Sequence, residues 1–404
     1  MRRREFISLL GGTVVIWPQA ARAEKKYGPG VGDTEIKVGN IMPYSGPASA
    51  FSLVGKTIGA YFDKLNADGG INGRKIKFIS YDDGYSPPKT VERARKLVED
   101  DGVLLIFASL GTAPNNAIRK YMNAKKVPQL FVFAGASEFG DPKRFPWTMG
   151  WQPTYQNEAR VYAKFLLEHE PHGKIGILSQ NDDLGKDYVA GLKDGLEGKM
   201  PIIAEVVYET TDPTVDSQIV TLKTSGADIL LNASTPKFAA QAIKKMVEIG
   251  WKPVHLLIRP SNSIGSVLKP TGLQNANGIL SSGFIKDPTD SSWNDDDGVK
   301  AWSFFMDQHF PGGDRNNSYT VLGYSVAQTF VQVLRQCGDD LTRENLMRQA
   351  ANLKSVELGM LLPGITVNTS PEDYYPIKQM QMMRFNGARW ERFGTIIGGG
   401  IGAR

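Results

Sequence analysis

Short apolar runs alternate with longer stretches of helical periodicity along the first two thirds of the chain. The longer stretches repeat apolar residues at spacings of three and four, which would give a helix one apolar face. The run 103–108 (VLLIFA) is apolar throughout, as is typical of a strand buried on both faces of a parallel sheet. The apolar runs predict strands at 36–41, 75–81, 103–108, 129–134, 174–179, 202–208, 228–231 and 254–258. The periodic stretches predict helices at 51–65, 89–99, 114–125, 154–170, 186–196, 216–224 and 237–249.

This alternation occurs twice in series, on either side of 139–151, where Pro142, Pro146 and the nearby Pro153 favour a linker. Each series predicts an open parallel sheet with helices on both faces, so the expected fold class is α/β with two doubly wound lobes. Beyond 258 the pattern is less regular. It predicts strands at 278–284 and 379–385, and helices that end near 309, span 322–334 and span 342–353. These pieces are expected to complete both lobes, so the chain must cross between them more than once.

Composition narrows the chemistry that such a fold can carry. The chain has 404 residues, 41% hydrophobic and 22% charged, which suits two or three globular domains. The single cysteine, Cys337, excludes a disulfide framework and a cysteine-rich metal site, and four histidines leave little for a histidine-based one. We therefore expect neither a metal nor a cofactor.

The first 23 residues have the features of an export signal. Arg2, Arg3 and Arg4 precede the apolar stretch 7–17, which is too short to span a bilayer, and 21–23 (ARA) gives a small-residue cleavage pattern. The arginines resemble a twin-arginine signal, with an arginine-rich Sec signal as the alternative. We expect a soluble periplasmic protein without a lipid anchor.

Much of the net charge of +5 belongs to this leader, which carries four arginines and one glutamate. The rest of the chain is nearly balanced and gives no reason to expect binding to nucleic acid.

No arrangement typical of an active site emerges. The segment 323–327 (GYSVA) lacks the final glycine of a nucleophile elbow and falls within a helical pattern. His169 and His172 lack metalloprotease spacing, and Pro171 between them would break the helix that must align them. A phosphate-binding GxxxxGK[ST] is also missing from the sequence. These observations predict a protein that is not an enzyme.

The loops that follow the predicted strands are more informative, because ligands of open α/β sheets bind at the carboxyl ends of the strands. Thr112 and Pro114 fit the start of a helix, whose free N–H groups and dipole favour a carboxylate. Thr235-Pro236 repeats this arrangement in the second lobe. Simple helix capping is the alternative for any one loop, but matched loops on two facing lobes favour a ligand cleft. The first lobe contributes the loops 43–50 (PYSGPASA), 109–114 (SLGTAP) and 135–137 (GAS).

Three motifs give a specific resemblance. Tyr44-Ser45-Gly46-Pro47 and Gly55 precede 66–74 (NADGGINGR), and Asp82-Asp83 closes the next strand. This combination resembles the leucine-binding family, the type I periplasmic solute-binding proteins of branched-chain amino acid ABC transporters, over about 34–390. The resemblance implies two lobes joined by three crossovers, one ligand in the cleft between them and an inner-membrane ABC permease as partner. We expect the binding protein to be a monomer.

The resemblance also suggests where the lobes begin and end. We expect 34–148 and 285–362 to form lobe 1, 149–284 and 363–392 to form lobe 2, and 393–404 to be a flexible tail.

The family's ligand loops can be carried over position by position. In amino-acid binders, the loops that match 109–112 and 135–137 hold the ligand's carboxylate and help hold its ammonium group. The second lobe of the family supplies an aromatic residue, where this chain has Leu184, and an acid, where it has Thr214 with Asp212 and Asp216 close by. The candidate ligand-binding residues are Tyr44, Ser45, Ser109, Thr112, Gly135, Ser137, Trp151, Asp182, Leu184, Thr214, Ser234 and Thr235.

The missing acid matters because burying an ammonium group without a counter-charge costs on the order of several kcal/mol of binding free energy. We therefore hypothesise a small carboxylate ligand without an α-amino group, such as an aromatic or branched acid. An amino acid is the alternative if Asp212 or Asp216 supplies the acid. Phe51, Phe133, Trp151 and Phe284 could supply an apolar wall, or they could be ordinary core. A ligand-sensing module that feeds a signalling partner and a secreted α/β enzyme are the alternatives to transport.

Overall fold

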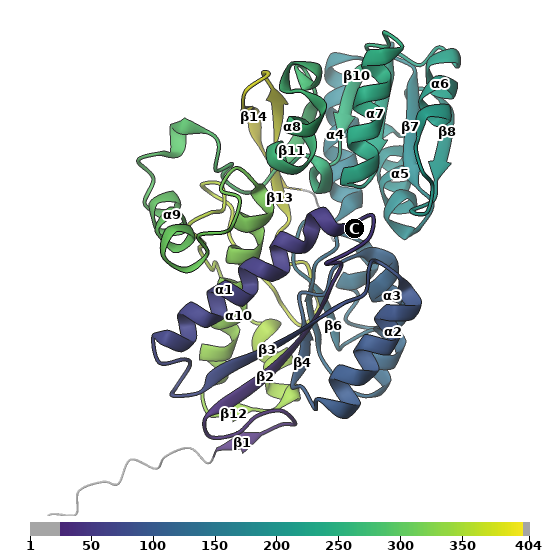
Figure 1. Cartoon of the computed structure of the whole chain (residues 1–404). Helices are drawn as coiled ribbons and strands as arrows, with labels where there is room; N and C mark the ends of the chain where they lie inside the picture. The colour runs from purple at the N-terminus through teal and green to yellow at the C-terminus, as the bar shows by residue number, and fades with distance from the viewer. Residues whose placement is uncertain (1–24, 399–404) are drawn as a thin grey trace, which may run out of the picture.

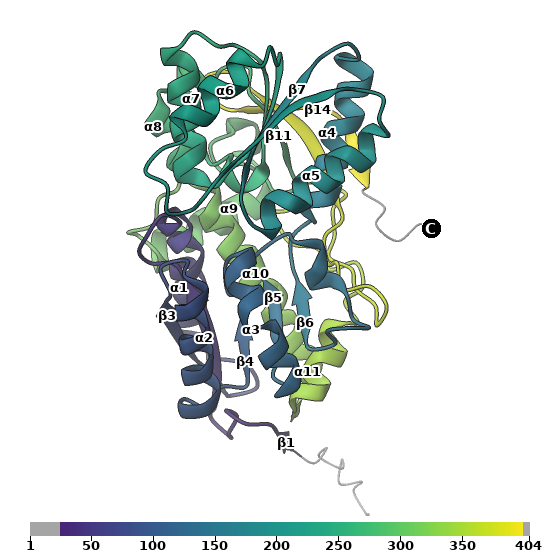
Figure 2. The ribbon, with the colours of Figure 1, turned by 90° about the vertical axis from the view of Figure 1, so that its right-hand side faces the viewer.

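The computed structural model describes residues 25–398, so the leader predicted at 1–23 lies outside the described residues, as do 399–404. Within the described range the chain forms two lobes, one above the other in Figures 1 and 2. Each lobe contains its own sheet, as the repeated strand–helix pattern predicts.

The sheet of the first lobe is parallel and has the strand order β3-β2-β4-β5-β6. Its helices cover both faces: α1 and α10 pack against one, and α2 and α3 against the other. The apolar run 103–108 yields the short, fully buried β4 at its centre. The strands are β2 (Glu35–Met42), β3 (Lys75–Asp82), β4 (Leu105–Phe107), β5 (Gln129–Val132) and β6 (Thr148–Gly150). The helices are α1 (Ser52–Ala67), α2 (Pro87–Arg95), α3 (Thr112–Ala124), α9 (Asp297–His309), α10 (Ser318–Cys337) and α11 (Arg343–Ala350).

The sheet of the second lobe has the order β14-β13-β11-β10-β9-β7-β8, with β13 and β14 antiparallel to their neighbours. Helices α4 and α5 pack on one face and α6 and α7 on the other. The strands are β7 (Ile175–Gln180), β8 (Ile202–Tyr208), β9 (Ile229–Ala233), β10 (Val254–Leu257), β11 (Leu280–Gly283), β13 (Gln379–Phe385) and β14 (Trp390–Gly398). The helices are α4 (Tyr155–His169), α5 (Asp183–Leu196), α6 (Asp216–Thr224), α7 (Pro236–Glu248) and α8 (Lys269–Thr271).

Three segments carry the chain between the sheets: one between β6 and α4, one after β11 and one before β13. In addition, β1 (Lys26–Tyr27) pairs with β12 (Asp340–Leu341) beside the first lobe. The α/β fold with two doubly wound lobes and three crossovers is thus confirmed. In the described range no helix is long and apolar enough to cross a membrane.

The prediction of a linker at 139–151 was wrong. Strand β6 lies inside this segment and pairs with β5 in the first sheet, with Met149 opposite Leu130. Phe139, Met149 and Trp151 are buried, so the apolar residues override the prolines. Residues 149 and 150, assigned by sequence to the second lobe, therefore belong to the first sheet.

The prediction of a flexible tail from 393 also needs correction. Strand β14 continues to Gly398 and pairs with β13, with Phe393 opposite Met382 and Ile397 opposite Met380. Phe393 and Ile397 pack against the core of the second lobe, which holds this segment in the sheet.

Candidate functional site

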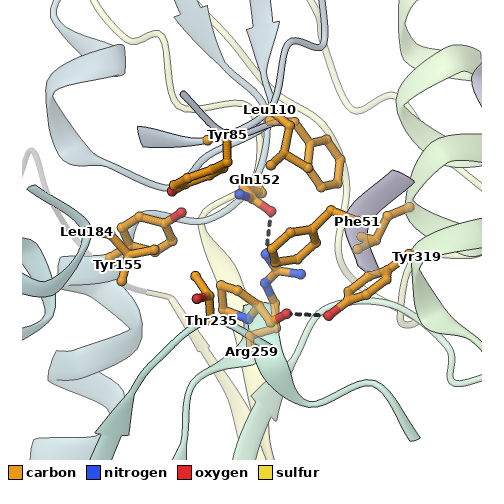
Figure 3. Close-up of a pocket in the computed structure, with 13 residues that line it drawn as sticks. Phe51, Tyr85, Leu110, Gln152, Tyr155, Leu184, Thr235, Arg259 and Tyr319 are labelled. Atoms are coloured by element: carbon orange, nitrogen blue, oxygen red, sulfur yellow. Dashed lines mark hydrogen bonds between the residues drawn. The ribbon is translucent and has the colours of Figure 1, made fainter. Parts of the chain in front are cut away.

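A pocket lies between the two lobes at the carboxyl ends of their strands (Figure 3). Both lobes and the first crossover contribute to its wall, as a ligand site that closes by lobe movement requires. The space between the lining atoms is about 380 Å³, but the room for the centre of a water molecule is only about 20 Å³. This suffices for about one water, so a larger ligand enters only when the lobes part or side chains turn. The lining residues are Phe51, Tyr85, Leu110, Gly111, Phe133, Gln152, Tyr155, Leu184, Thr235, Arg259, Pro260, Tyr319 and Leu322.

The first lobe supplies a mainly apolar and aromatic wall. The rings of Phe51 and Tyr319 lie with their centres 4.9 Å apart, and Leu322 lies one turn along the same helix as Tyr319. Phe133 extends this wall, and Trp151 stacks behind it at 6.2 Å between ring centres. A ligand in this pocket would place apolar surface against these side chains.

Tyr85 closes the pocket from the loop after β3. Its backbone is left-handed, with φ of 63°, and its hydroxyl oxygen lies 3.4 Å from the Gln180 amide nitrogen in the second lobe. A Cβ at Gly111 would lie 2.5 Å from the Tyr85 ring, so a glycine is required there for the ring to lie over the β4–α3 loop.

Arg259 is the main polar feature of the second lobe's wall. It lies two residues after the end of β10 and is only 6% exposed. One Nη donates a hydrogen bond to Oε1 of Gln152, and the guanidinium lies 5.1 Å from the centre of the Phe284 ring. Figure 3 shows this side chain reaching across the pocket towards Gln152. Within residues 25–398 Arg259 forms no ion pair with a carboxylate.

The buried carboxylate of Glu158 contacts the backbone of Arg259, and both of its oxygens already accept hydrogen bonds. Oε1 of Glu158 accepts from the backbone N–H of Arg259 at 2.6 Å, from the Tyr162 hydroxyl at 2.5 Å and from the Ser282 hydroxyl at 3.1 Å. Its Oε2 accepts from the Tyr188 hydroxyl at 2.6 Å. Glu158 therefore holds the backbone of Arg259 in place but does not form an ion pair with its guanidinium.

Two of the predicted site residues line the pocket, Leu184 and Thr235. Leu184 lies in the first turn of α5. Thr235 donates from its hydroxyl to Oε1 of Gln180 at 3.1 Å, and its backbone N–H donates to the Tyr208 hydroxyl at 2.9 Å. Both stand on the second lobe.

The predicted carboxylate loops of the first lobe lie next to the pocket, but the hydroxyls of Ser109 and Ser137 are engaged elsewhere. The Ser109 hydroxyl donates to Oδ1 of Asn115. The backbone N–H and hydroxyl of Ser137 donate to the Asp187 carboxylate at 2.7 and 2.9 Å. Gly135 provides room for the Tyr155 ring, which would lie 2.6 Å from a Cβ there. Thr112 is the first residue of α3 and is fully buried, and its hydroxyl has no hydrogen-bond partner among the described residues. Burial raises the pKa of Tyr155, which also lines the pocket, to about 12.

Four further candidates lie outside the lining and have structural contacts. The Tyr44 hydroxyl lies 2.6 Å from the Ser80 hydroxyl, and the Ser45 hydroxyl donates to Oδ2 of Asp82 at 2.6 Å. The Trp151 indole N–H donates to the Thr329 hydroxyl at 3.0 Å. The remaining candidate, Ser234, donates to Oδ1 of Asn232.

The structure does not bring an acid with a free oxygen to the pocket wall. Thr214 is exposed and outside the lining, and neither Asp212 nor Asp216 lines the pocket. Asp182 lies nearer, but its Oδ1 accepts from the Leu184 and Gly185 N–H groups and its Oδ2 from the Gln180 amide. Burial raises the pKa of Asp182 above its ordinary value.

Sequence reasoning missed Tyr85, Gln152, Tyr155, Arg259 and Tyr319. The rule that ligands bind after strand ends would have selected Tyr85, which follows β3, and Arg259, which follows β10. Gln152, Tyr155 and Tyr319 reach the pocket through the crossover and through helix packing, for which the local sequence has no signal. In the described range no group of three or more His, Cys, Asp or Glu side chains could hold a metal ion.

Comparison with known proteins agrees with this architecture. A family model described as periplasmic binding protein matches residues 35–389. The Leu/Ile/Val-binding protein homolog 8 of Brucella abortus (strain 2308) is 22% identical over 236 residues, which are 55% of this chain and 57% of that protein. The homolog 7 of the same strain is 24% identical over 237 residues, 54% of this chain and 57% of its own. The match thus spans little more than half the length of these curated relatives.

Solved structures share the fold over nearly the whole chain. A branched-chain amino acid ABC transporter structure from Thermus thermophilus with bound valine has a TM-score of 0.82 at 13% identity and covers 91% of this chain and 97% of its own. A substrate-binding periplasmic protein from Ralstonia solanacearum has a TM-score of 0.79 at 22% identity, with coverages of 89% and 100%. A fatty acid ABC transporter substrate-binding protein from Thermomonospora curvata has a TM-score of 0.76 at 20% identity, with coverages of 93% and 95%. At these identities the likeness shows the fold alone. From the family match, the chain belongs to the periplasmic binding proteins, a family of substrate-binding proteins and not of enzymes.

Proposed function

We propose that this protein is the substrate-binding component of an ABC importer and that it captures a small carboxylate-bearing ligand between its lobes. The observation that carries this proposal is the pocket itself, which residues of both lobes and Gln152 of the crossover line together. A ligand there touches both lobes only when they are close together, so binding stabilises the closed arrangement.

The lining supports an organic ligand with an apolar body and one polar end. Phe51, Phe133 and Leu322 offer apolar surface, whereas Arg259 and Gln152 supply polar groups at one side. The named ligands of the structural relatives, valine and fatty acids, combine a carboxylate with an apolar body in the same way. The tight cavity favours a small ligand of this kind.

The transport role extends this proposal beyond the pocket. We propose that the leader at 1–23 directs the protein to the periplasm, where it acts as a monomer and delivers its ligand to an inner-membrane permease. The permease would bind the closed form, because closure brings surfaces of both lobes into one fixed arrangement. The proposed lobe limits remain those of the sequence, with the corrections at 149–150 and 393–398.

A thermal-shift screen tests ligand capture. The purified protein is unfolded and refolded to remove carried-over ligand, then heated with leucine, isoleucine, valine, phenylalanine and matching acids without the amino group. A ligand at 100 times its dissociation constant adds about 2.7 kcal/mol of stability, which raises the unfolding midpoint by a few degrees. If no member of the panel shifts the midpoint, the proposed ligand class is wrong.

A pair of variants locates the binding site. Leu184→Trp places a large side chain in the tight pocket and should abolish the ligand-induced shift. Val207→Trp is the control, because Val207 is 52% exposed on the edge strand β8, away from the lining, and should leave the shift unchanged. Equal shifts in both variants would place the ligand elsewhere.

A further inference from the structure

The residues that line the pocket include one with a positive charge, Arg259, and none with a negative charge. Arg259 brings a guanidinium into a nearly buried position, and within residues 25–398 only Gln152 accepts a hydrogen bond from it. Removing a charge from water is costly unless a partner of opposite charge replaces the lost hydration. The Phe284 ring, 5.1 Å away, compensates part of this cost through a cation–π interaction. A full counter-charge is missing from the described part of the chain.

Of the hydroxyls in the loops expected to hold a carboxylate, only that of Thr112 is without a hydrogen-bond partner within residues 25–398, and Thr112 lies outside the pocket lining. The hydroxyls of Ser109 and Ser137 already donate to Asn115 and Asp187. The Ser137 backbone N–H donates to the same Asp187 carboxylate. A ligand anion in this closed arrangement would therefore have to displace bonds within the protein at Ser109 and Ser137, whereas the guanidinium of Arg259 lines the pocket without a carboxylate partner.

We propose that Arg259 selects the ligand, which is a monocarboxylate with an aromatic or branched hydrocarbon body and without an ammonium group. This inference rests on the proposed function and specifies the substrate class of the same pocket. The planar guanidinium can bind both carboxylate oxygens at once, and such charged bonds are stronger in a dry pocket than in water. The aromatic wall of Phe51, Phe133 and Tyr319 then packs against the hydrocarbon.

Two further observations support this assignment. The positive charge of Arg259 acts on the Tyr155 and Tyr319 hydroxyls of the pocket wall. Burial raises the pKa of both hydroxyls, and the charge of Arg259 opposes this rise. Asp182 and Glu158, which accept hydrogen bonds from the backbone of the lining residues Leu184 and Arg259, already accept hydrogen bonds at both carboxylate oxygens. An ammonium group would therefore meet a positive charge without a free acid to bind it.

Matched ligands test the charge preference in the unmodified protein. Phenylacetate, phenylacetamide and phenylalanine form one series, and 4-methylpentanoate, its amide and leucine form another. Titration calorimetry should give at least tenfold tighter binding for each acid than for its amide, because a charge-assisted bond is worth about 10- to 100-fold in affinity. The amino acids should bind more weakly than the acids.

Variants assign the preference to Arg259. Arg259→Gln should remove the preference for the acid over the amide while it preserves binding of the amide. Arg259→Lys should restore part of the preference, since lysine keeps the charge but lacks the planar fork. Arg389→Gln, in the exposed β13–β14 hairpin, is the control and should bind like the unmodified protein.

The outcomes separate the inference from the proposed function. Tightest binding of an amino acid, or an unchanged acid preference in a folded Arg259→Gln, overturns the inference but leaves capture between the lobes intact. Failure of every compound in both series to bind the unmodified protein overturns the inference and counts against the proposed carboxylate ligand as well. Should Arg259→Gln not fold, the preference in the unmodified protein and in Arg259→Lys decides.

Discussion

His255 and Arg259 lie four positions apart at the end of β10, and both are buried, with different consequences. Arg259 faces the pocket, whereas His255 points into the second lobe, where its Nε2 lies 3.2 Å from the Asn232 amide nitrogen. Nε2 accepts this hydrogen bond only when it is unprotonated. Burial lowers the pKa of His255 to about 3, so the folded protein holds it neutral.

Stability should therefore fall in mild acid partly because of His255. An unfolded histidine binds a proton below its ordinary pKa of about 6.5, but the folded protein does not do so until about 3, so acid favours the unfolded state. The loss is at most about 1.4 kcal/mol per pH unit. His255→Gln should flatten the pH dependence of the free energy of unfolding, measured by urea denaturation between pH 7.5 and 4.5. His172→Gln, at an exposed position, is the control, and equal slopes in both variants would contradict this assignment.

At the scale of single residues, the sequence indicates the right region more readily than the right contacts. The loop after β9 predicts Thr235 and the family's aromatic position predicts Leu184, and both residues line the pocket. Ser109 and Ser137 lie in loops of the same kind, yet protein groups occupy their hydroxyls. Which hydroxyl remains free depends on partners from distant segments, such as Asp187, and a loop sequence does not contain that information.

The N-cap of helix α10, Asn317, links this helix of the first lobe to the second lobe. Asn317 caps it: Oδ1 accepts from the Tyr319 N–H at 3.1 Å and also from the Ser263 hydroxyl of the second lobe at 3.0 Å. The Asn317 amide donates to the Ser266 hydroxyl at 2.5 Å. The same helix places Tyr319 in the pocket wall, so its cap helps position the aromatic surface.

Replacing this cap should weaken the molecule measurably. Asn317→Ala removes the cap and both bonds to the second lobe, and should lower the free energy of unfolding by about 1–3 kcal/mol. Asn317→Asp keeps the acceptor for Tyr319 and Ser263 and should lose less. Urea denaturation measures both, and an alanine variant as stable as the unmodified protein would contradict the proposed role of the cap.

At the scale of elements, long periodic patterns and continuous apolar runs were sufficient, whereas β6 and β14 lack such a pattern. The helices and the central strands follow from apolar spacing, but β6 has three residues and stands among prolines. After the buried Trp390, strand β14 carries exposed and half-buried residues without regular alternation, so its apolar signal is weak. Both strands form because a neighbouring strand offers a register, which is a property of the assembled sheet.

Direct hydrogen bonds hold the two lobes of the whole molecule together, some beside the pocket and one within its wall. Ser137 of the first lobe donates two bonds to Asp187 on α5, and the Asn116 amide donates to Oδ2 of Asp183 at 2.9 Å. The Tyr319 hydroxyl donates to the Pro260 carbonyl at 2.7 Å. These contacts favour the closed arrangement independently of a ligand.

Removal of one such contact should open the protein. Asp187→Ala eliminates both bonds from Ser137, and at about 1 kcal/mol each their loss lowers the ratio of closed to open molecules about 30-fold. Small-angle X-ray scattering without ligand should then give a larger radius of gyration. Glu205→Ala removes a surface carboxylate whose partner, Lys193, lies in the same lobe, and should leave the radius unchanged. An unchanged radius in Asp187→Ala would rule out this contact as a latch.

The C-terminal strands of the second sheet have a consequence for biosynthesis. Strand β13 pairs with β11, yet α9, α10 and α11 are all made between them. Until residues 379–385 emerge from the ribosome, β11 presents one bare edge, which is a site for mispairing with other chains. The first lobe is also encoded in separate pieces, because its sheet lies within 35–150 whereas α10 and α11 follow β11 of the second lobe. Export before folding, or protection of the nascent chain, would prevent mispairing at the bare edge of β11.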